Sequence, residues 1–320
     1  MTGHGAARPA LRARWRLPGP RGILARGRLR RIEGVKAIGY AKAALRKSWW
    51  PVRRLTAPLR RLPDALILGA QKAGTTTLFH WLAQHPEVAS AARKEIHFFD
   101  TSYERGLGHY RAHFPTALLR PAFEGAGGRG RLLFDATPSY LYAPWIPGRV
   151  ARDLPHAKHV VLLRDPVERA FSHWRLSRRH GREDLSFDEA ILRETERTAA
   201  SARRAEADGG GRVTSEYWWH SYAARGRYAE QLERWFAAFP RERFLVLESD
   251  ALREDPASAF ADVCRFLGLS PWRPAAFESR NVGGEKDRPS PATVERLRAH
   301  FRPHDERLAA LLGKRLRWMG

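Results

Sequence analysis

The sequence has a single cysteine, Cys264, among 320 residues. One cysteine cannot form an intrachain disulfide, and nothing indicates an oxidising compartment. The chain also lacks any run that approaches the roughly 20 apolar residues of a membrane-spanning helix. Its basic N-terminus has neither the continuous apolar core nor the small-residue cleavage site of a secretory signal. These absences predict a cytoplasmic protein, with peripheral contact to a membrane as a further option.

Acidic residues are almost missing from the first 62 residues. This segment holds 17 Lys and Arg and one acid, Glu33, a net charge of +16, whereas residues 63–320 hold 40 bases and 33 acids, a net of +7. We therefore divide the chain into a basic arm, residues 1–62, partly disordered or helical, and a globular domain, residues 63–320. The arm fits a solvated tail, a weak contact with an anionic membrane or polymer, or a nucleic-acid arm. Nucleic acid is the least supported partner, because no recognised DNA-binding motif is present.

Short apolar runs alternate with amphipathic segments from residue 63 onward. The pattern predicts strands at residues 65–68, 132–135, 159–163 and 244–247. It predicts helices at residues 75–84, 150–154, 168–179, 222–239 and 256–267, and a mobile loop at 205–212. Strands separated by helices form a parallel sheet covered on both faces. The predicted fold class is α/β, a P-loop-like three-layer αβα fold with a central parallel sheet.

Residues 65–82, ALILGAQKAGTTTLFHWL, predict an anion-binding loop. A buried strand is followed by a turn between Gly69 and Gly74 and by a helix that opens on three threonines. The amides of such a turn and the positive end of the helix dipole bind phosphate. In an ATP-binding P-loop the lysine follows the second glycine, but here Lys72 lies inside the loop. We predict phosphate binding without ATP hydrolysis; an ordinary strand–helix turn is the alternative.

Residues 159–174, HVVLLRDPVERAFSHW, form a second motif. Arg164 follows the end of a predicted strand, where ligands of open α/β sheets bind, and Pro166 suits the start of a helix. The fork of Arg164 and the hydroxyl of Ser172, eight residues later, can hold one phosphate. The alternative is an unrelated pair of surface residues. A magnesium-binding strand usually ends in aspartate, so this motif also argues against a metal-dependent NTPase.

Together these motifs resemble the sulfotransferases that use 3′-phosphoadenosine 5′-phosphosulfate (PAPS). In that family a loop like GAQKAGTTTL binds the 5′-phosphosulfate, and a strand–Arg-Asp-Pro–helix–Ser segment binds the 3′-phosphate. The resemblance implies PAPS as co-substrate and no metal. It implies contacts to the 5′ side from Lys72, Ala73, Gly74, Thr75 and Thr76, and contacts to the 3′-phosphate from Arg164 and Ser172.

Residues 94–100, KEIHFFD, resemble the heparan sulfate (glycan) sulfotransferase branch, in a bacterial-type form. In that branch the glutamate is the catalytic base, which implies this role for Glu95, with Lys72 as the second catalytic group. The resemblance places Lys94, His97 and Asp100 at the acceptor. A carboxylate here can take a proton from a hydroxyl or amine. Two alternatives stay open: Glu95 as a mere ion-pair partner of Lys94 or Arg93, and His97 as the base.

Two further segments resemble the family but depart from its pattern. Residues 135–141, DATPSYL, correspond to an acceptor-contacting segment that usually has a lysine where Ala136 stands. Residues 286–291, KDRPSP, resemble a K-G-R-x-x-P loop that closes over the co-substrate, with Asp287 in place of the glycine. By this resemblance Lys286 and Arg288 contact the co-substrate. The resemblance covers residues 63–313.

The implied function is transfer of a sulfuryl group from PAPS to a hydroxyl or amine of an acceptor, with a glycan or glycolipid expected. One alternative is a P-loop nucleotide kinase or NTPase, for which turnover would require magnesium. The other is a nucleic-acid-binding protein that uses the basic arm and shows steeply salt-dependent binding. Four aromatic residues are candidates either for the acceptor cleft or for the core: Tyr217, Trp218, Trp219 and Tyr222.

Overall fold

The computed structural model describes residues 49–116, 131–210, 213–279 and 288–320. The predictions for residues 1–48 and for Lys286 lie outside the described residues. One compact unit spans Pro51–Gly320. Within the ranges given above, no helix has the length and apolar character needed to cross a membrane.

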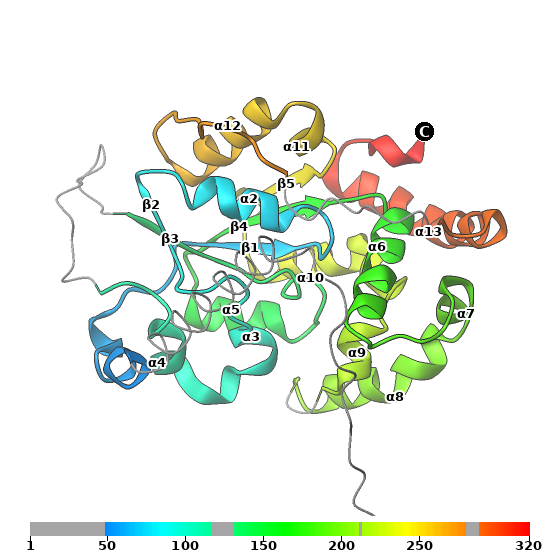
Figure 1. The fold of residues 1–320 in the computed structure, drawn as a ribbon, viewed down its shortest axis with the longest axis horizontal. Helices are drawn as coiled ribbons and strands as arrows, with labels where there is room; N and C mark the ends of the chain where they lie inside the picture. Colours follow the sequence, from blue (N-terminus) through cyan, green and yellow to red (C-terminus); the bar gives the residue numbers. More distant parts are fainter. Residues whose placement is uncertain (1–48, 117–130, 211–212, 280–287) are drawn as a thin grey trace, which may run out of the picture. The chain divides into compact units, whose positions relative to one another are not determined.

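A parallel sheet of five strands forms the centre of this unit (Figure 1). Its strands lie in the order β2-β3-β1-β4-β5. The central strand β1 pairs with β3 and β4, so that Leu66 lies opposite both Asp135 and His159. Every residue of β1 is buried, as the apolar run in the sequence requires. The strands are β1 (Ala65–Gly69), β2 (Val88–Ser90), β3 (Leu132–Ala136), β4 (Lys158–Leu163) and β5 (Phe244–Glu248).

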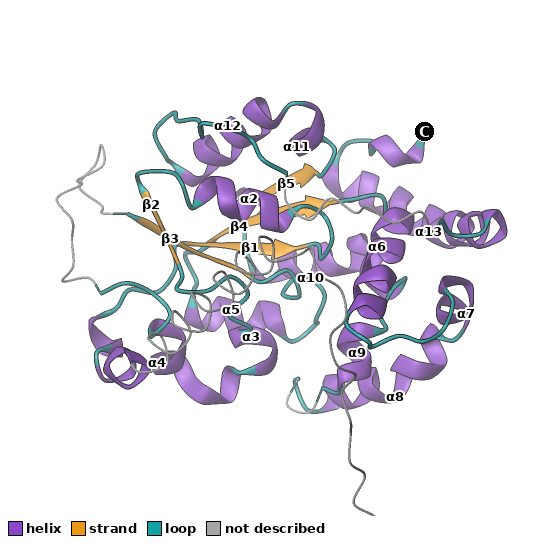
Figure 2. Cartoon of the chain, viewed as in Figure 1, coloured by secondary structure: helices purple, strands orange, loops and turns teal. Residues whose placement is uncertain are grey.

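Helices cover both faces of the sheet, which confirms the three-layer prediction (Figure 2). On one face Trp81 of α2 packs edge-on against Phe260 of α12, with ring centroids 6.2 Å apart. On the other face the ring centroids of Trp235 in α10 and His159 in β4 lie 5.2 Å apart. Among the earlier helices are α2 (Thr75–Leu82), α3 (Phe98–Thr101), α4 (Gly106–Arg111), α5 (Ile146–Asp153), α6 (Pro166–Arg179), α7 (Phe187–Leu192) and α8 (Glu194–Ala207). The later ones are α9 (Ser215–Trp219), α10 (Tyr228–Ala238), α11 (Ala251–Glu254), α12 (Pro256–Leu267) and α13 (Pro291–Leu312).

The predicted elements differ from the observed ones mainly at their ends. The helix predicted at 222–239 begins at Tyr228, because Gly226 disfavours helix and the preceding residues form a 3₁₀ turn, Ala224–Gly226. The loop predicted at 205–212 begins later than expected, since α8 continues to Ala207, and residues 211–212 lie outside the described residues. Strand β2 was too short to be predicted, and α13 was not predicted either.

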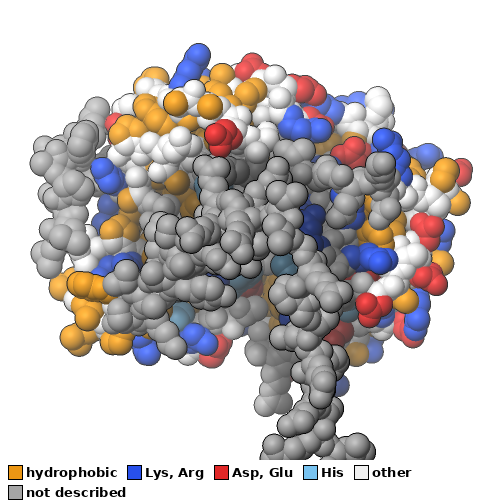
Figure 3. All heavy atoms as spheres, in the orientation of Figure 1, with side chains coloured by type: hydrophobic (Ala, Val, Ile, Leu, Met, Phe, Trp, Pro, Cys, Tyr) orange, Lys and Arg blue, Asp and Glu red, His pale blue; other side chains and the backbone are white. Residues whose placement is uncertain are grey.

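Charges of both signs are spread over the surface of this unit. On the face drawn in Figure 3, Lys and Arg side chains alternate with Asp and Glu around the right-hand rim. This mixed distribution matches the small net charge of residues 63–320, 40 bases against 33 acids.

Candidate active site

A cavity of about 810 Å³ lies beside the segments that follow β1, β3 and β4. The carboxyl ends of neighbouring parallel strands meet at one edge of a sheet, which is where ligands of such folds bind. Three separate parts of the sequence therefore reach one space. The cavity is lined by Gln71, Lys72, Gly74, Thr75, Thr76, Arg93, Glu95, Ile96, His97, Asp100, Thr101, Ser102, Arg105, Pro138, Ser139, Arg164, Ser172, Leu176, His180, Trp218, Trp219 and Arg225.

The loop between β1 and α2 depends on two glycines. A Cβ on Gly69 would lie 2.8 Å from the Pro138 carbonyl oxygen, so only glycine allows β1 to approach the segment after β3 this closely. Gly74 has φ +93°, which favours glycine, and precedes α2 without a side-chain cap. The amides of Thr75 and Thr76 therefore have no side-chain cap and lie at the positive end of the helix dipole. Both residues line the cavity, an arrangement typical of anion sites.

Lys72 lies at the centre of a group of cations. Its backbone has φ +75°, a conformation that costs a non-glycine residue about 1–2 kcal/mol. Burial lowers the pKa of Lys72, and three nearby arginines lower it further: Arg179, Arg164 and Arg175. The charge of Glu95 acts in the opposite direction. An anion bound beside Lys72 would relieve this repulsion.

Arg164 and Ser172 line the same cavity from the start of α6. The helix begins at Pro166 and is capped by Asp165, whose Oδ1 accepts from the Val167 amide at 2.9 Å. The Arg164 guanidinium donates to Glu168 Oε2 at 2.9 Å and to the Lys72 carbonyl at 3.2 Å. This last bond ties the second motif to the first. The Glu168 pair is half exposed, and such pairs contribute little to stability.

The 94–100 motif contributes a strained loop to the opposite wall. Among the described residues, the non-glycine residues with positive φ are Lys72, Glu95 and His97, with φ +75°, +60° and +58°. All of them line the cavity. Strained backbone of this kind persists only where the surroundings fix it, and it is concentrated at functional sites.

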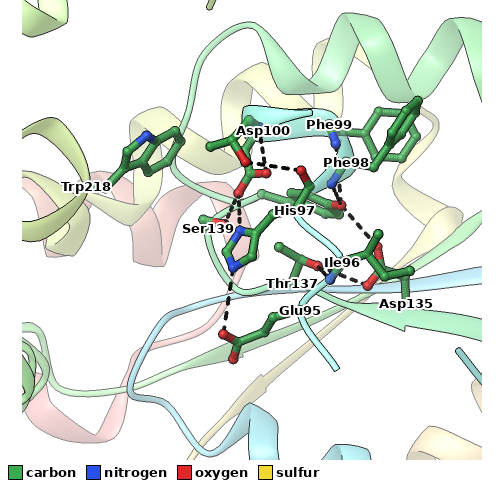
Figure 4. A network of polar contacts seen from close by, with 12 residues as sticks. Glu95, Ile96, His97, Phe98, Phe99, Asp100, Asp135, Thr137, Ser139 and Trp218 are labelled. Atoms are coloured by element: carbon green, nitrogen blue, oxygen red, sulfur yellow. Dashed lines mark hydrogen bonds and ion pairs between the residues drawn. The ribbon is translucent and has the colours of Figure 1, made fainter. Parts of the chain in front are cut away.

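Glu95, His97 and Asp100 form a chain of polar contacts (Figure 4). His97 Nε2 lies 3.8 Å from Glu95 Oε2, and its Nδ1 lies 2.7 Å from Asp100 Oδ2. Burial alone would lower the pKa of His97, but the hydrogen bond and charge of Asp100 outweigh it and raise the pKa. The side chain of Glu95 is 43% exposed, whereas that of Asp100 is 1% exposed. Of these two acids, Glu95 is therefore the more accessible to a molecule in the cavity.

A buried aspartate fixes the backbone of this loop. Asp135 accepts from the hydroxyls of Thr137 at 2.9 Å, Tyr140 at 3.0 Å and Tyr110 at 3.1 Å. Thr137 and Tyr140 in turn accept from the amides of Ile96 at 3.1 Å and Phe98 at 2.9 Å. Burial raises the pKa of Asp135 to about 6, although these donors act against the rise. The DATPSYL segment thus holds the loop in place, a role that its sequence did not reveal.

The cavity carries an excess of positive charge. Its lining includes five Lys or Arg residues and two acids, a difference of three before any histidine is protonated. A carboxylate, Glu95, therefore faces a space that favours anions. The described residues, those of the cavity included, contain no group of three or more His, Cys, Asp or Glu side chains arranged to hold a metal ion.

The structure brings most of the predicted site residues together. Nine of them line the cavity: Lys72, Gly74, Thr75, Thr76, Glu95, His97, Asp100, Arg164 and Ser172. Ala73 is buried beneath the loop, and its amide donates to the Ala70 carbonyl at 3.1 Å. Lys94 ion-pairs with Glu95 without lining the cavity, and the exposed Arg288 does not line it either.

Other lining residues were not assigned from the sequence. Trp218 and Trp219 line the cavity, whereas Tyr217 and Tyr222 are buried, so the aromatic group divides between cleft and core. Arg225 also lines the cavity, although it is buried and fell inside the helix predicted at residues 222–239. An arginine just before a glycine at a helix start was the available signal.

Comparisons with known proteins agree with this geometry. A parallel sheet with a cationic cavity at the carboxyl ends of its strands, beside a helix N-terminus, is typical of α/β proteins that bind phosphate-bearing molecules. The sequence matches the sulfotransferase domain family over residues 62–278. The chain belongs to this family and is a sulfotransferase.

Named relatives share about a third of the aligned residues. The chain is 31% identical to heparan sulfate glucosamine 3-O-sulfotransferase 6 of Mus musculus, over 81% of this chain and 74% of that protein. It is 30% identical to the bifunctional heparan sulfate N-deacetylase/N-sulfotransferase of Drosophila melanogaster, over 79% of this chain but 26% of that protein. The crystal structure of a sulfotransferase from Alicyclobacillus acidocaldarius superimposes with a TM-score of 0.61 and 31% identity, over 80% of this chain and 98% of that one.

Proposed function

We propose that this sulfotransferase transfers the sulfuryl group of PAPS to a hydroxyl or amine of a glycan. The observation that carries the proposal is one cavity in which an anion-binding loop with Lys72 faces a carboxylate, Glu95. The family generally uses PAPS, which supplies the sulfuryl group to be transferred. The family match also favours sulfuryl transfer over the kinase alternative.

The residues around α2 and α6 fit the two phosphate-bearing ends of PAPS. The first-turn amides of α2 and the Lys72 ammonium offer donors to the 5′ side, where negative charge grows as the sulfuryl group leaves. Arg164 and Ser172 offer a guanidinium fork and a hydroxyl to the 3′-phosphate. In this assignment the guanidinium exchanges Glu168 for the phosphate.

Glu95 is the proposed base. The sulfur–oxygen bond to the 5′-phosphate breaks, its electron pair stays on the phosphate, and a new bond forms between sulfur and the acceptor oxygen or nitrogen. The acceptor proton passes to Glu95, whose carboxylate is accessible from the cavity. His97 and Asp100 hold that carboxylate from behind as positioning residues.

A glycan acceptor is supported by the relatives and by the cavity wall. The curated relatives named above act on heparan sulfate by their names. In this chain Trp218 and Trp219 present indole rings to the cavity, and aromatic rings suit the apolar faces of sugars. O-sulfation and N-sulfation both fit the proposed base.

The test begins with the desulfated product, 3′-phosphoadenosine 5′-phosphate (PAP). Calorimetric titration without magnesium should show micromolar binding that is much tighter than ATP binding. Arg164→Ala should weaken PAP about 10-fold or more, because a hydrogen bond to a charged group contributes about 1.5–3 kcal/mol. Arg241→Ala, a change outside the cavity wall, is the matched control.

Transfer is measured next, with PAPS and a panel of heparan-type glycans and glycolipids. Sulfated product without added magnesium supports the proposal. Absence of PAP binding, or a preference for Mg-ATP, would reject the co-substrate assignment. PAP binding with no transfer to any glycan would reject only the proposed acceptor class.

A further inference from the structure

The cavity wall contains an arginine, Arg225, that makes no ion pair with any acid of the described residues. Arg225 is 3% exposed, and its Nη2 donates to the Trp218 carbonyl at 3.1 Å. Within the described structure, its Nε and Nη1 atoms are buried and have no hydrogen-bond partner. A buried guanidinium with unsatisfied N–H groups is costly, and a bound anion would remove that cost.

Aromatic rings enclose this guanidinium. Its central carbon lies 4.7 Å from the centroid of the Tyr142 ring and 5.5 Å from that of Trp218. The indole Nε1 of Trp218, also in the cavity wall, is a second buried donor without a partner in the described structure. Burial and the charge of Arg169 lower the pKa of Arg225 to about 10, so it remains a cation at neutral pH.

Arg225 lines the cavity together with Glu95 and Asp100, and its 3₁₀ turn, Ala224–Gly226, also packs against the start of α6, where a Cβ on Gly226 would lie 2.9 Å from the Pro166 Cβ. It donates to the Trp218 carbonyl, and Trp218 lines the same cavity as Asp100. The charge of Asp100 also acts on Arg225. The arginines that most affect Lys72 are different ones, from α6 and its start.

We propose that Arg225, together with the Trp218 indole N–H, binds a negatively charged group of the acceptor, a carboxylate or a sulfate. This inference rests on the proposed function. The guanidinium fork suits the planar carboxylate of a uronic acid.

Three sugars that differ at one position test this subsite. Methyl β-D-glucuronoside, methyl β-D-glucoside 6-sulfate and methyl β-D-glucoside are titrated into PAP-saturated protein, and binding is followed by ligand-observed NMR. We expect at least one anionic sugar to bind about 10-fold or more tighter than the neutral one, as for a hydrogen bond to a charged group. The stronger of the two anionic sugars identifies carboxylate or sulfate as the preferred group.

Substitutions test whether Arg225 causes the preference for an anionic sugar. Arg225→Gln should abolish the preference for the anionic sugar while PAP affinity changes by less than about twofold, and Arg225→Lys should retain part of it. Arg227→Gln, two residues along and outside the cavity wall, is the matched control and should behave as wild type. Trp218→Phe should reduce the preference less than Arg225→Gln.

Several outcomes would overturn the proposal. These are equal binding of all three sugars to the wild type, no binding of any of them, a preserved preference in Arg225→Gln, or a loss of PAP affinity in that variant as large as in Arg164→Ala. The wild-type comparison needs no substitution, so it decides the matter even if Arg225→Gln does not fold. Loss of PAP binding by the wild type would instead contradict the proposed function.

Discussion

The two halves of the cavity are built in different ways. The half with Lys72 comes from two strand–loop–helix units, β1 to α2 and β4 to α6, and each unit is continuous in the sequence. The half with Glu95 is assembled from the 94–100 loop, the segment after β3 and the residues before α10. A short motif can specify the first half, whereas the second depends on side chains that meet through the tertiary fold.

Each half of the cavity suits the requirements of one of the two substrates. A phosphate-bearing donor presents the same charged groups in every reaction, and a backbone cradle suits it. An acceptor differs from one enzyme to the next, and side chains on separate segments can change independently. The departure at Ala136 from the lysine that the resemblance implies is the kind of change that the second half permits.

The largest effect is expected at the carboxylate of the second half. Glu95→Gln keeps the shape of the side chain but removes the base, so kcat should fall about 10²–10⁴-fold with PAP affinity nearly unchanged. The measurement is the initial rate of sulfate transfer, with PAP affinity by calorimetry. Glu104→Gln, an exposed acid outside the cavity wall, serves as the control. Turnover close to wild type would show that Glu95 is only an ion-pair partner of Lys94.

Lys72→Ala tests the first half. Removing the ammonium should lower kcat about 10²–10³-fold, because a preorganised positive charge at the leaving phosphate is lost. The backbone cradle stays, so PAP should still bind, though more weakly. Lys314→Ala, an exposed lysine far along the chain and outside the cavity wall, should leave both quantities unchanged. An unaltered kcat in Lys72→Ala would mean that the amides alone stabilise the leaving group.

The sequence was sufficient for the first half because local chemistry determines it. The apolar run of β1, the two glycines and the threonines at the start of α2 are adjacent in the chain, and the structure places them as predicted. The central strands were predictable for the same reason, since continuous burial leaves continuous apolar runs. Strand β2, with three residues, leaves no such run.

The second half was predicted only where a family motif named its residues. Glu95, His97 and Asp100 were identified by resemblance, but the network under them was not, because Asp135 and Tyr110 meet across 25 residues of sequence. Arg225 was predicted only as part of a helix, and its place in the cavity wall was not predicted. Its burial depends on Tyr142 and Trp218, two rings from different segments. The roles of these residues in catalysis stay predictions until the variants are measured.

Asp135 gives an effect on stability that depends on pH. Its pKa of about 6 in the folded protein exceeds the value of about 3.9 expected for an unfolded chain, so the folded state binds the proton more tightly. Its contribution to stability is therefore fully present below about pH 4 and is lost as the pH rises through about 6. The size is on the order of 1–3 kcal/mol.

Asp135→Asn isolates this contribution, because other acids titrate alike in both proteins. The free energy of unfolding, from urea titrations between pH 4 and 7, should fall with pH more steeply in the wild type than in the variant. Asp305→Asn is the comparison, since burial also raises the pKa of Asp305 to about 6, at a position outside the cavity wall. Both variants should reduce the slope of the unfolding free energy against pH. Only Asp135→Asn should also lower kcat, by displacing the Glu95 loop. An identical pH slope in Asp135→Asn and wild type would contradict this account.

The smallest expected effect is a change in PAP affinity caused by the ion pair between Arg164 and Glu168. The Arg164 guanidinium donates to Glu168, and the 3′-phosphate would have to compete with that carboxylate. Glu168→Gln should therefore tighten PAP binding about two- to fivefold, because an exposed pair contributes about 0.2–1 kcal/mol. Arg164→Ala changes the affinity in the opposite direction, and in the double variant the gain from Glu168→Gln should disappear. A gain that persists without Arg164 would mean that Glu168 repels the phosphate directly, and the donor half of the cavity would then be limited by its overall charge rather than by this pair.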